Sequence, residues 1–176
     1  VSYMLRLENG RGMAYLTTAL EELGLRWAYR VVDARAFGVP QRRQRVLMVA
    51  SRSLDPRAVL LGDDEGRDFD PADSIGEVDA GSLYGFYWTE GLRGLGWTRQ
   101  AVPTVKGGSA LGIPSPPAIW CPSTGFIGTP NIIDAERLQG FRPGWTLPAT
   151  NSGFREGARW KLVGNAVCVP MAQWIA

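Results

Sequence analysis

The segment Gly38–Arg45 (GVPQRRQR) concentrates polar side chains directly before a run of apolar residues. Alternate side chains of a strand share one face, so we expect Gln41, Arg43 and Arg45 to point to the same side. Two convergent guanidinium groups bind a phosphate, a carboxylate or the carbonyl edge of a base. A solvated basic turn would have the same composition, and these residues alone leave both interpretations open.

Small residues beside a lysine mark a second candidate segment, PTVKGGS at positions 103–109. Here Thr104, Lys106, Gly107 and Gly108 would allow a backbone to approach a ligand closely. A mobile loop is the alternative explanation.

Two later segments suit a ligand or a brace between parts of the fold. RLQGF (137–141) would end a helix at Gly140 and carry Arg137 and Gln139 on different sides, although an amphipathic helix with a glycine cap explains it equally. GNAV (164–167) predicts a turn that opens a helix and presents backbone N–H groups to an anion. Most such turns are only helix starts.

Composition excludes several kinds of site. The 176 residues include no histidine and only two cysteines, Cys121 and Cys168. Histidine catalysis and most zinc sites are therefore excluded, and we expect no metal. We also expect a reducing interior rather than a disulfide framework. No run approaches the ~18 apolar residues of a membrane span, so we expect no membrane partner.

Charge is distributed in blocks. Residues 1–53 carry nine arginines against four acids, residues 54–79 carry two arginines against nine acids, and residues 80–176 carry eight bases against four acids. Two basic blocks around an acidic insert suit a polyanionic partner. Three ordinary solvated surfaces would give the same counts.

The elements that must position these residues begin with helix, strand, loop and strand. One apolar face predicts a helix over Gly12–Leu23, with Gly24 just beyond its end. Aromatic and β-branched residues predict strands at Trp27–Val32 and Arg45–Ala50. The long polar connection between them indicates the edge of an α/β sheet.

The remainder alternates between loop-rich and helical segments. Ser53–Asp79 is acidic without periodicity, which predicts a linker or surface excursion. Ala80–Pro130 has 16 glycines and prolines but also seven aromatic residues, which predicts a folded, loop-rich lobe. We expect a helix over Asn131–Gly140 capped by Asp134, and a short element at Arg159–Val163. A final helix over Ala166–Ala176 would tolerate Pro170 in its first turn.

The order of these segments resembles the DNA cytosine-5 methyltransferase family. GVPQRRQRVLMVAS, AERLQGF and KLVGNAVCVPMAQWI are similar to motifs VIII, IX and X, in the family's order. PTV is similar to the Pro-Thr-hydrophobic signature of the target-recognition region. Val1 matches the valine of the family's Glu-Asn-Val motif, so the resemblance covers most of the chain.

The resemblance implies an α/β fold, the C-terminal part of a Rossmann-like S-adenosylmethionine-dependent methyltransferase. Its last two strands would form an antiparallel hairpin, and a small, mostly-β, loop-rich target-recognition lobe would be inserted. Residues 1–53 would end the catalytic domain. Residues 54–133 would form the acidic linker and the lobe, and residues 134–176 the helices of motifs IX and X.

The resemblance also implies roles for individual residues. In the family a thiolate attacks C6 of a flipped-out cytosine in double-stranded DNA, and C5 then takes the methyl group. Arg45 matches the arginine on the cytosine carbonyl, Arg43 its companion, and Gln41 the leading glutamine of the motif. The remaining matches are Asn165, Ala166 and Val167 lining the S-adenosylmethionine pocket, Thr104, Lys106, Gly107 and Gly108 near the DNA bases, and Arg137, Gln139 and Gly140 bracing the lobe.

The chain departs from the family in what it lacks. The Pro-Cys nucleophile and the glycine-rich cofactor loop are absent, and neither Cys121 nor Cys168 matches the nucleophile. We therefore expect this chain alone to be inactive, with the missing N-terminal catalytic portion supplied in cis or in trans. The alternatives are a recognition subunit of a naturally split enzyme and a relative that acts on RNA. A cytoplasmic restriction–modification protein of a bacterium or phage would be typical of the family.

Overall fold

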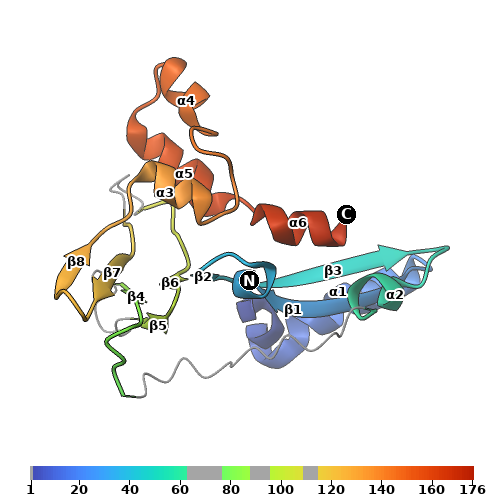
Figure 1. The fold of residues 1–176 in the computed structure, drawn as a ribbon. Helices are drawn as coiled ribbons and strands as arrows, with labels where there is room; N and C mark the ends of the chain where they lie inside the picture. The colour runs from blue at the N-terminus through green and yellow to red at the C-terminus, as the bar shows by residue number, and fades with distance from the viewer. Residues whose placement is uncertain (1, 63–76, 88–95, 109–114) are drawn as a thin grey trace. The chain divides into compact units, whose positions relative to one another are not determined.

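The computed structural model describes residues 2–62, 77–87, 96–108 and 115–176 (Figure 1). The chain divides into two compact units. The first comprises Val1–Asp33, Gln44–Phe69 and Ile175, and the second Ala34–Arg43, Asp70–Trp174 and Ala176. Helices and strands are mixed, consistent with an α/β protein. No helix in the described ranges is long and apolar enough to span a bilayer.

The first unit is built on an antiparallel pair of strands. Strands β1 and β3 pair from Arg26 opposite Ser51 to Asp33 opposite Gln44, which confirms both predicted strands and their antiparallel pairing. Helix α1 matches its prediction to within one residue at each end, and Gly24 beyond it has a φ of 70°. The elements of this unit are η1 (Ser2–Gly10), α1 (Arg11–Glu22), β1 (Arg26–Asp33), β3 (Gln44–Ser51) and α2 (Pro56–Leu60).

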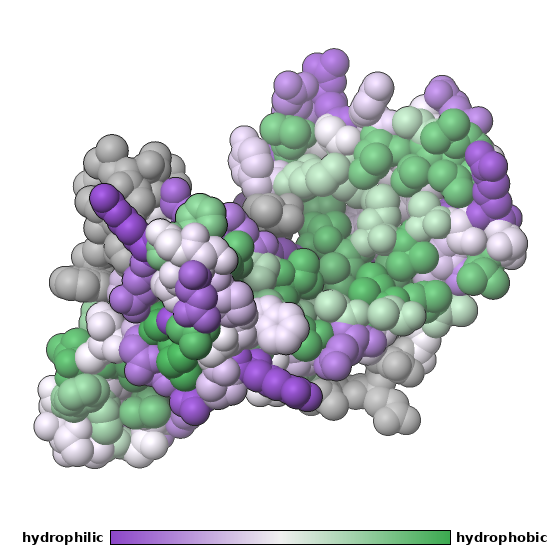
Figure 2. Space-filling model, turned by 90° about the horizontal axis from the view of Figure 1, so that it is seen from above, coloured by the Kyte–Doolittle hydropathy of each residue, from purple (hydrophilic) through white to green (hydrophobic). Residues whose placement is uncertain are grey.

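One face of this hairpin is apolar and partly exposed. The register places Tyr29 opposite Met48 and Val31 opposite Val46, and Trp27 stacks on Tyr29 with ring centroids 6.1 Å apart. Figure 2 shows apolar side chains gathered on the side of the molecule where Figure 1 draws this hairpin. A two-stranded sheet is marginal alone, so such a face is available for further packing.

Helix α2 lies within the acidic segment that was predicted to be a linker or a surface excursion, and the sequence did not predict this helix. Pro56 occupies the first turn, and the Asp55 carboxylate accepts a hydrogen bond from the Arg57 backbone N–H at 3.0 Å. The side-chain hydrogen bonds from Arg57 lower the pKa of Asp55 to about 2. Arg30 of β1 donates to the Leu60 carbonyl at 3.1 Å, which ties this helix to the hairpin. Residues 63–76 of the acidic segment lie outside the described residues.

The second unit contains a small antiparallel sheet in the order β5-β4-β7-β8. Aromatic rings fill it, with Phe86 stacked on Trp97 at 4.6 Å and Trp120 in contact with both Trp97 and Tyr84. A separate parallel pair joins β2 to β6. The described part of Ala80–Pro130 is therefore folded and loop-rich, as predicted. The strands are β2 (Gln41–Arg42), β4 (Tyr84–Phe86), β5 (Thr98–Arg99), β6 (Val102–Pro103), β7 (Ala118–Cys121) and β8 (Phe126–Gly128); η2 (Ala34–Phe37) precedes them.

The helices of the second unit are α3 (Ile132–Arg137), α4 (Leu147–Asn151), α5 (Glu156–Asn165) and α6 (Val169–Ile175). Asp134 takes part in capping α3, as predicted: Asn131 is the N-cap residue, and the Asp134 carboxylate accepts from its backbone N–H in a capping box. Helix α6 begins three residues later than expected, with Pro170 in its first turn as predicted.

The core of this unit joins the strand β6 region to helices α3 and α5. Apolar side chains from all three meet there. Cys168 is also fully buried in this unit, as a small apolar side chain would be. The buried members are Val102, Val105, Ile132, Ala135, Trp160 and Val163.

Candidate functional site

The side-chain amide of Gln41 connects three segments of the second unit. Its Oε1 accepts from the Val105 backbone N–H at 2.8 Å, and its Nε2 donates to the Leu138 carbonyl and to Gln139 Oε1. Gln41 is fully buried, so each of these bonds replaces one to water. The leading glutamine of the predicted site therefore joins the segment after β6 to the end of α3.

Arg43 makes a second connection from the same short stretch of chain. Its Nη1 donates to the Val105 carbonyl at 3.2 Å, and its Nη2 donates to the carbonyls of Gly164 and Ala166 at 3.0 and 2.6 Å. The residue is only 2% exposed. Its guanidinium lies among main-chain carbonyls of this unit, which is the geometry of a positioning residue.

Arg45 differs from Arg43 in its surroundings. It is the second residue of β3 in the first unit, opposite Val32, and its Nη1 donates to the neighbouring Gln44 carbonyl at 2.7 Å. Partial burial lowers the pKa of its guanidinium. The two arginines fall in different units, so their convergence stays a prediction.

The predicted DNA-contacting segment lies close to these bonds. The Thr104 hydroxyl donates to the Arg42 carbonyl at 2.7 Å, and the Lys106 ammonium lies 4.2 Å from the centre of the Tyr87 ring. Gly108 has a φ of 92°, where a side chain would be strained. The bases that this segment would contact stay a prediction.

Gly107 has a packing reason to be glycine. A Cβ there would lie 2.9 Å from Cα of Lys161 on α5. Reciprocally, a Cβ on Gly164 would lie 2.1 Å from the Gly107 backbone nitrogen. The backbones of the segment after β6 and of α5 therefore touch directly.

The three residues matched to motif IX have separate environments. Gln139 is buried and donates to the Val163 carbonyl at 2.7 Å, whereas Arg137 is exposed and pairs with Asp134 at 3.4 Å. Gly140 has a φ of 80°, and a Cβ there would lie 2.6 Å from Pro170 of α6. Gln139 and Gly140 thus attach the end of α3 to α5 and α6.

The prediction of a turn at Gly164–Asn165 is wrong. Both residues belong to the last turn of α5, and Ala166 follows in an extended conformation with its N–H bonded to the Leu162 and Val163 carbonyls. Position 164 of this helix is glycine because a Cβ there would clash with the backbone of Gly107. The backbone N–H of Ala166 is used within the helix, so the groups open to a ligand are the exposed side chains of Asn165 and Val167.

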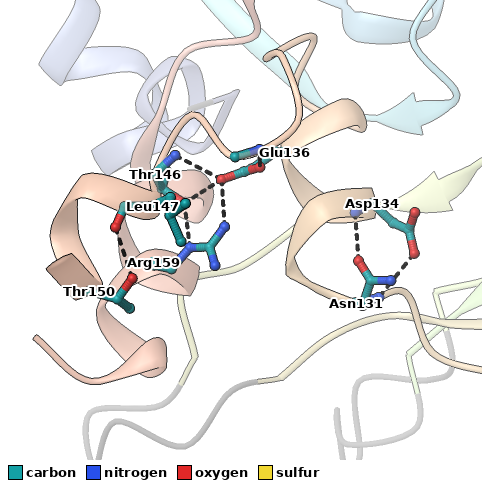
Figure 3. A network of polar contacts seen from close by, with 8 residues as sticks. Asn131, Asp134, Glu136, Thr146, Leu147, Thr150 and Arg159 are labelled. Carbon is teal, nitrogen blue, oxygen red and sulfur yellow. Dashed lines mark hydrogen bonds and ion pairs between the residues drawn. The ribbon is translucent and has the colours of Figure 1, made fainter.

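A buried polar network was missed by the analysis of the sequence. Figure 3 shows the Glu136 carboxylate facing Arg159, with Thr146 hydrogen-bonded to both. Arg159 Nη2 lies 3.0 Å from Glu136 Oε1, and the backbone N–H groups of Gly144 and Thr146 also donate to this carboxylate. The signal was present in AERLQG, where Glu136 and Gln139 lie three residues apart in the predicted helix over Asn131–Gly140 and would share a face.

Comparison with known proteins adds two matches. A family model described as C-5 cytosine-specific DNA methylase matches residues 1–70. The chain is 56% identical over 178 residues to the type II methyltransferase M2.BsuMI of Bacillus subtilis (strain 168). That match covers 99% of this chain. The chain belongs to the C-5 cytosine-specific DNA methylase family. It spans 45% of the length of the relative.

The second unit has a shallow groove beside α3, with a volume of about 340 Å³. Arg137 and Asp134 contribute its charges, and Phe126 of β8 lies at its wall. Its complete lining is Ile119, Phe126, Gly128, Thr129, Pro130, Asp134, Arg137 and Leu138.

The two cysteines of the chain differ in environment. The side-chain hydrogen bond with Ser123 lowers the pKa of Cys121, whereas burial raises the pKa of Cys168. Within the described residues, no cluster of three acidic or sulfur ligands is arranged to hold a metal ion.

Proposed function

We propose that this chain is the recognition and closing part of a DNA cytosine-5 methyltransferase. The whole protein would transfer a methyl group from S-adenosylmethionine to C5 of a cytosine in double-stranded DNA. The type II name of the relative supports a bacterial, cytoplasmic restriction–modification setting. The nucleophilic cysteine and most of the cofactor pocket would come from an N-terminal catalytic portion, in cis or in trans.

The observation that carries this proposal is the pair of buried connections made by Gln41 and Arg43. Together they join the segments matched to motif VIII, the Pro-Thr-Val signature, motif IX and motif X. We call this set of hydrogen bonds among the four segments, all within the second unit, the frame. We infer that this frame holds the recognition segment in a fixed relation to the motif X turn.

The residues at the end of α5 and directly after it fit the amino-acid end of the cofactor. Asn165 offers a polar amide and Val167 an apolar side chain, both exposed, while Arg43 fixes the Ala166 carbonyl between them. When bound, S-adenosylmethionine supplies the methyl group. In our proposal Asn165 and Val167 bind and orient it, and Arg43 holds the turn that carries them.

Arg45 would act on the substrate itself. C6 of cytosine is inaccessible inside the base stack, so the target base must leave the duplex. Charge then develops on the ring, and a donor aimed at its carbonyl lowers the barrier. The partial desolvation of Arg45 would strengthen such a bond, because a charged donor interacts more strongly in a less polar environment.

Labelled S-adenosylmethionine tests the proposal. We expect methyl incorporation into duplex DNA from the intact protein, and none from residues 1–176 alone. Adding the cysteine-bearing catalytic portion should restore incorporation. Incorporation by this chain alone would refute the division of roles. Transfer RNA as the substrate distinguishes the RNA-acting alternative, which predicts methylation of that substrate and not of DNA.

A further inference from the structure

The buried carboxylate of Glu136 holds the chain on both sides of one tryptophan. It accepts from the backbone N–H of Gly144 and, at 2.8 Å, from the backbone N–H of Thr146. Trp145 lies between these two residues. Arg159 and the Thr146 hydroxyl also donate to this carboxylate, as Figure 3 shows. Because Glu136 is fully buried, the turn that carries Trp145 is held by a buried group.

Trp145 itself remains open to solvent. It is 61% exposed, although its ring lies within 8° of parallel to the Phe141 ring at a centroid distance of 5.7 Å. The backbone N–H of Trp145 also donates to the Arg142 carbonyl at 3.1 Å. A large aromatic side chain held in one position loses little conformational freedom on binding, which is the property of an anchor residue.

The exposed charged side chains nearest in sequence to this tryptophan are arginines. From Arg137 to Arg155 the chain contains three arginines and no acidic residue. Arg137 pairs with Asp134, whereas Arg142 belongs to the same turn as Trp145 and is exposed, like Arg155. A rigid aromatic ring beside an exposed arginine is complementary to a polyanion with apolar sugar rings.

We propose that Trp145 and Arg142 form a contact site for the sugar–phosphate backbone of double-stranded DNA. This inference rests on the proposed function, because it assigns a further part of the DNA contact to the same protein. Arg142 pairs with a phosphate, and the indole packs on the adjoining deoxyribose. Such contacts fix position and carry no sequence information directly. This site therefore contributes affinity and leaves sequence choice to the recognition lobe.

The test is a binding titration of the intact methyltransferase with a labelled duplex at several salt concentrations. Trp145→Ala should raise Kd roughly tenfold, in line with the loss of an aromatic contact to nucleic acid. Arg142→Ala should weaken binding and reduce the slope of log K against log salt by about 1. Both effects should be equal on specific and unrelated duplexes, and kcat at saturating DNA should be unchanged.

Tyr15→Ala supplies the matched control, because Tyr15 is an aromatic residue 81% exposed on α1. It should bind DNA like the wild type. Arg142 is exposed, so its variant keeps the test decisive if Trp145→Ala fails to fold.

Several results would overturn the inference. Unchanged Kd and salt slope in the folded variants, or lost kcat with unchanged Kd, would do so. A variant that alters only self-association would instead mark a protein interface. A wild type that methylates DNA while the variants bind normally leaves the proposed function intact. A wild-type protein that neither binds nor methylates DNA would refute the proposed function itself.

Discussion

Gly164 and Gly107 lie in backbone contact, although 57 positions separate them in the sequence. A Cβ on Gly164 would lie 2.1 Å from the nitrogen of Gly107 and 2.6 Å from its Cα. The contact joins α5 to the segment that carries the proposed DNA-contacting residues. Arg43 reinforces it by binding the carbonyls of Val105 and Gly164.

Gly164→Ala should therefore destabilise the protein. Alanine usually stabilises a helix relative to glycine by roughly 0.5–1 kcal/mol. Here the backbones must separate, and overpacking costs about 1–3 kcal/mol. We expect a net loss in urea unfolding. Gly12→Ala on α1 is the control, since its Cβ would meet only the end of the exposed Leu7 side chain at 3.1 Å. Equal stability of both variants would contradict the contact.

Arg43→Lys should lose stability despite keeping the charge. A lysine ammonium is a compact donor without the planar fork that reaches the Val105, Gly164 and Ala166 carbonyls together. Leaving buried carbonyls without donors costs about 1–3 kcal/mol each. The midpoint of urea unfolding measures this effect. A midpoint equal to that of the wild type would show that the fork is dispensable.

Arg45→Ala should lower the reaction rate and leave stability nearly unchanged, in contrast to Arg43→Lys. In the intact enzyme we expect the activation free energy of single-turnover methylation to rise by about 3–4 kcal/mol, so that the rate falls. DNA affinity should be nearly unchanged. Unfolding should change little, because Arg45 is only half-buried. A wild-type rate in this variant would remove Arg45 from the chemistry.

Glu136 should make stability depend on acidic pH. Burial alone would raise the pKa of its carboxyl, but hydrogen bonds from Thr146, Arg159 and the Gly144 N–H outweigh it and hold the pKa below the usual 4.5. The unfolded chain then binds the proton more readily than the folded chain. Stability should fall as the pH drops below about 4.5 and keep falling until the carboxyl protonates in the folded state.

Urea unfolding between about pH 3 and pH 7 checks this dependence. Glu136→Gln should cost about 3–5 kcal/mol at neutral pH, because it leaves Arg159 buried without its carboxylate. The remaining pH dependence should be flatter. A variant with the wild-type slope would show that other carboxyls cause it.

Local patterns in the sequence predicted the helices and strands that are long enough to show a periodic pattern of apolar residues. The strands of the β1–β3 hairpin and helix α1 follow directly from alternation and from one apolar face. Helix α2 has five residues, too few for periodicity, and its contact with the hairpin through Leu60 is invisible in one dimension. Asp134 was correctly chosen as a capping residue of α3, but residue types alone could not show its reciprocal hydrogen bonds with Asn131, which fix the start of the helix.

The site was predictable as a set of motifs and not as a set of contacts. Gln41 and Arg43 were selected for their types, but the backbone groups that they bind lie between 62 and 123 positions away. Glu136 was overlooked because a glutamate is expected on the surface, and its partner Arg159 lies 23 positions further on. Gly164 was assigned to a turn because a glycine in the last turn of a helix is explained only by the backbone that it touches.

The connections of Arg43 and Gln41 to the Val105 segment end only on main-chain atoms. Every amino acid except proline carries the same N–H and C=O at that position. At Val105 these two connections thus fix the path of the chain without contacting its side chain. Under the proposed function, substitutions at exposed positions of the recognition segment that preserve this backbone path would leave its attachment intact, so a new DNA specificity could evolve there with the docking geometry unchanged.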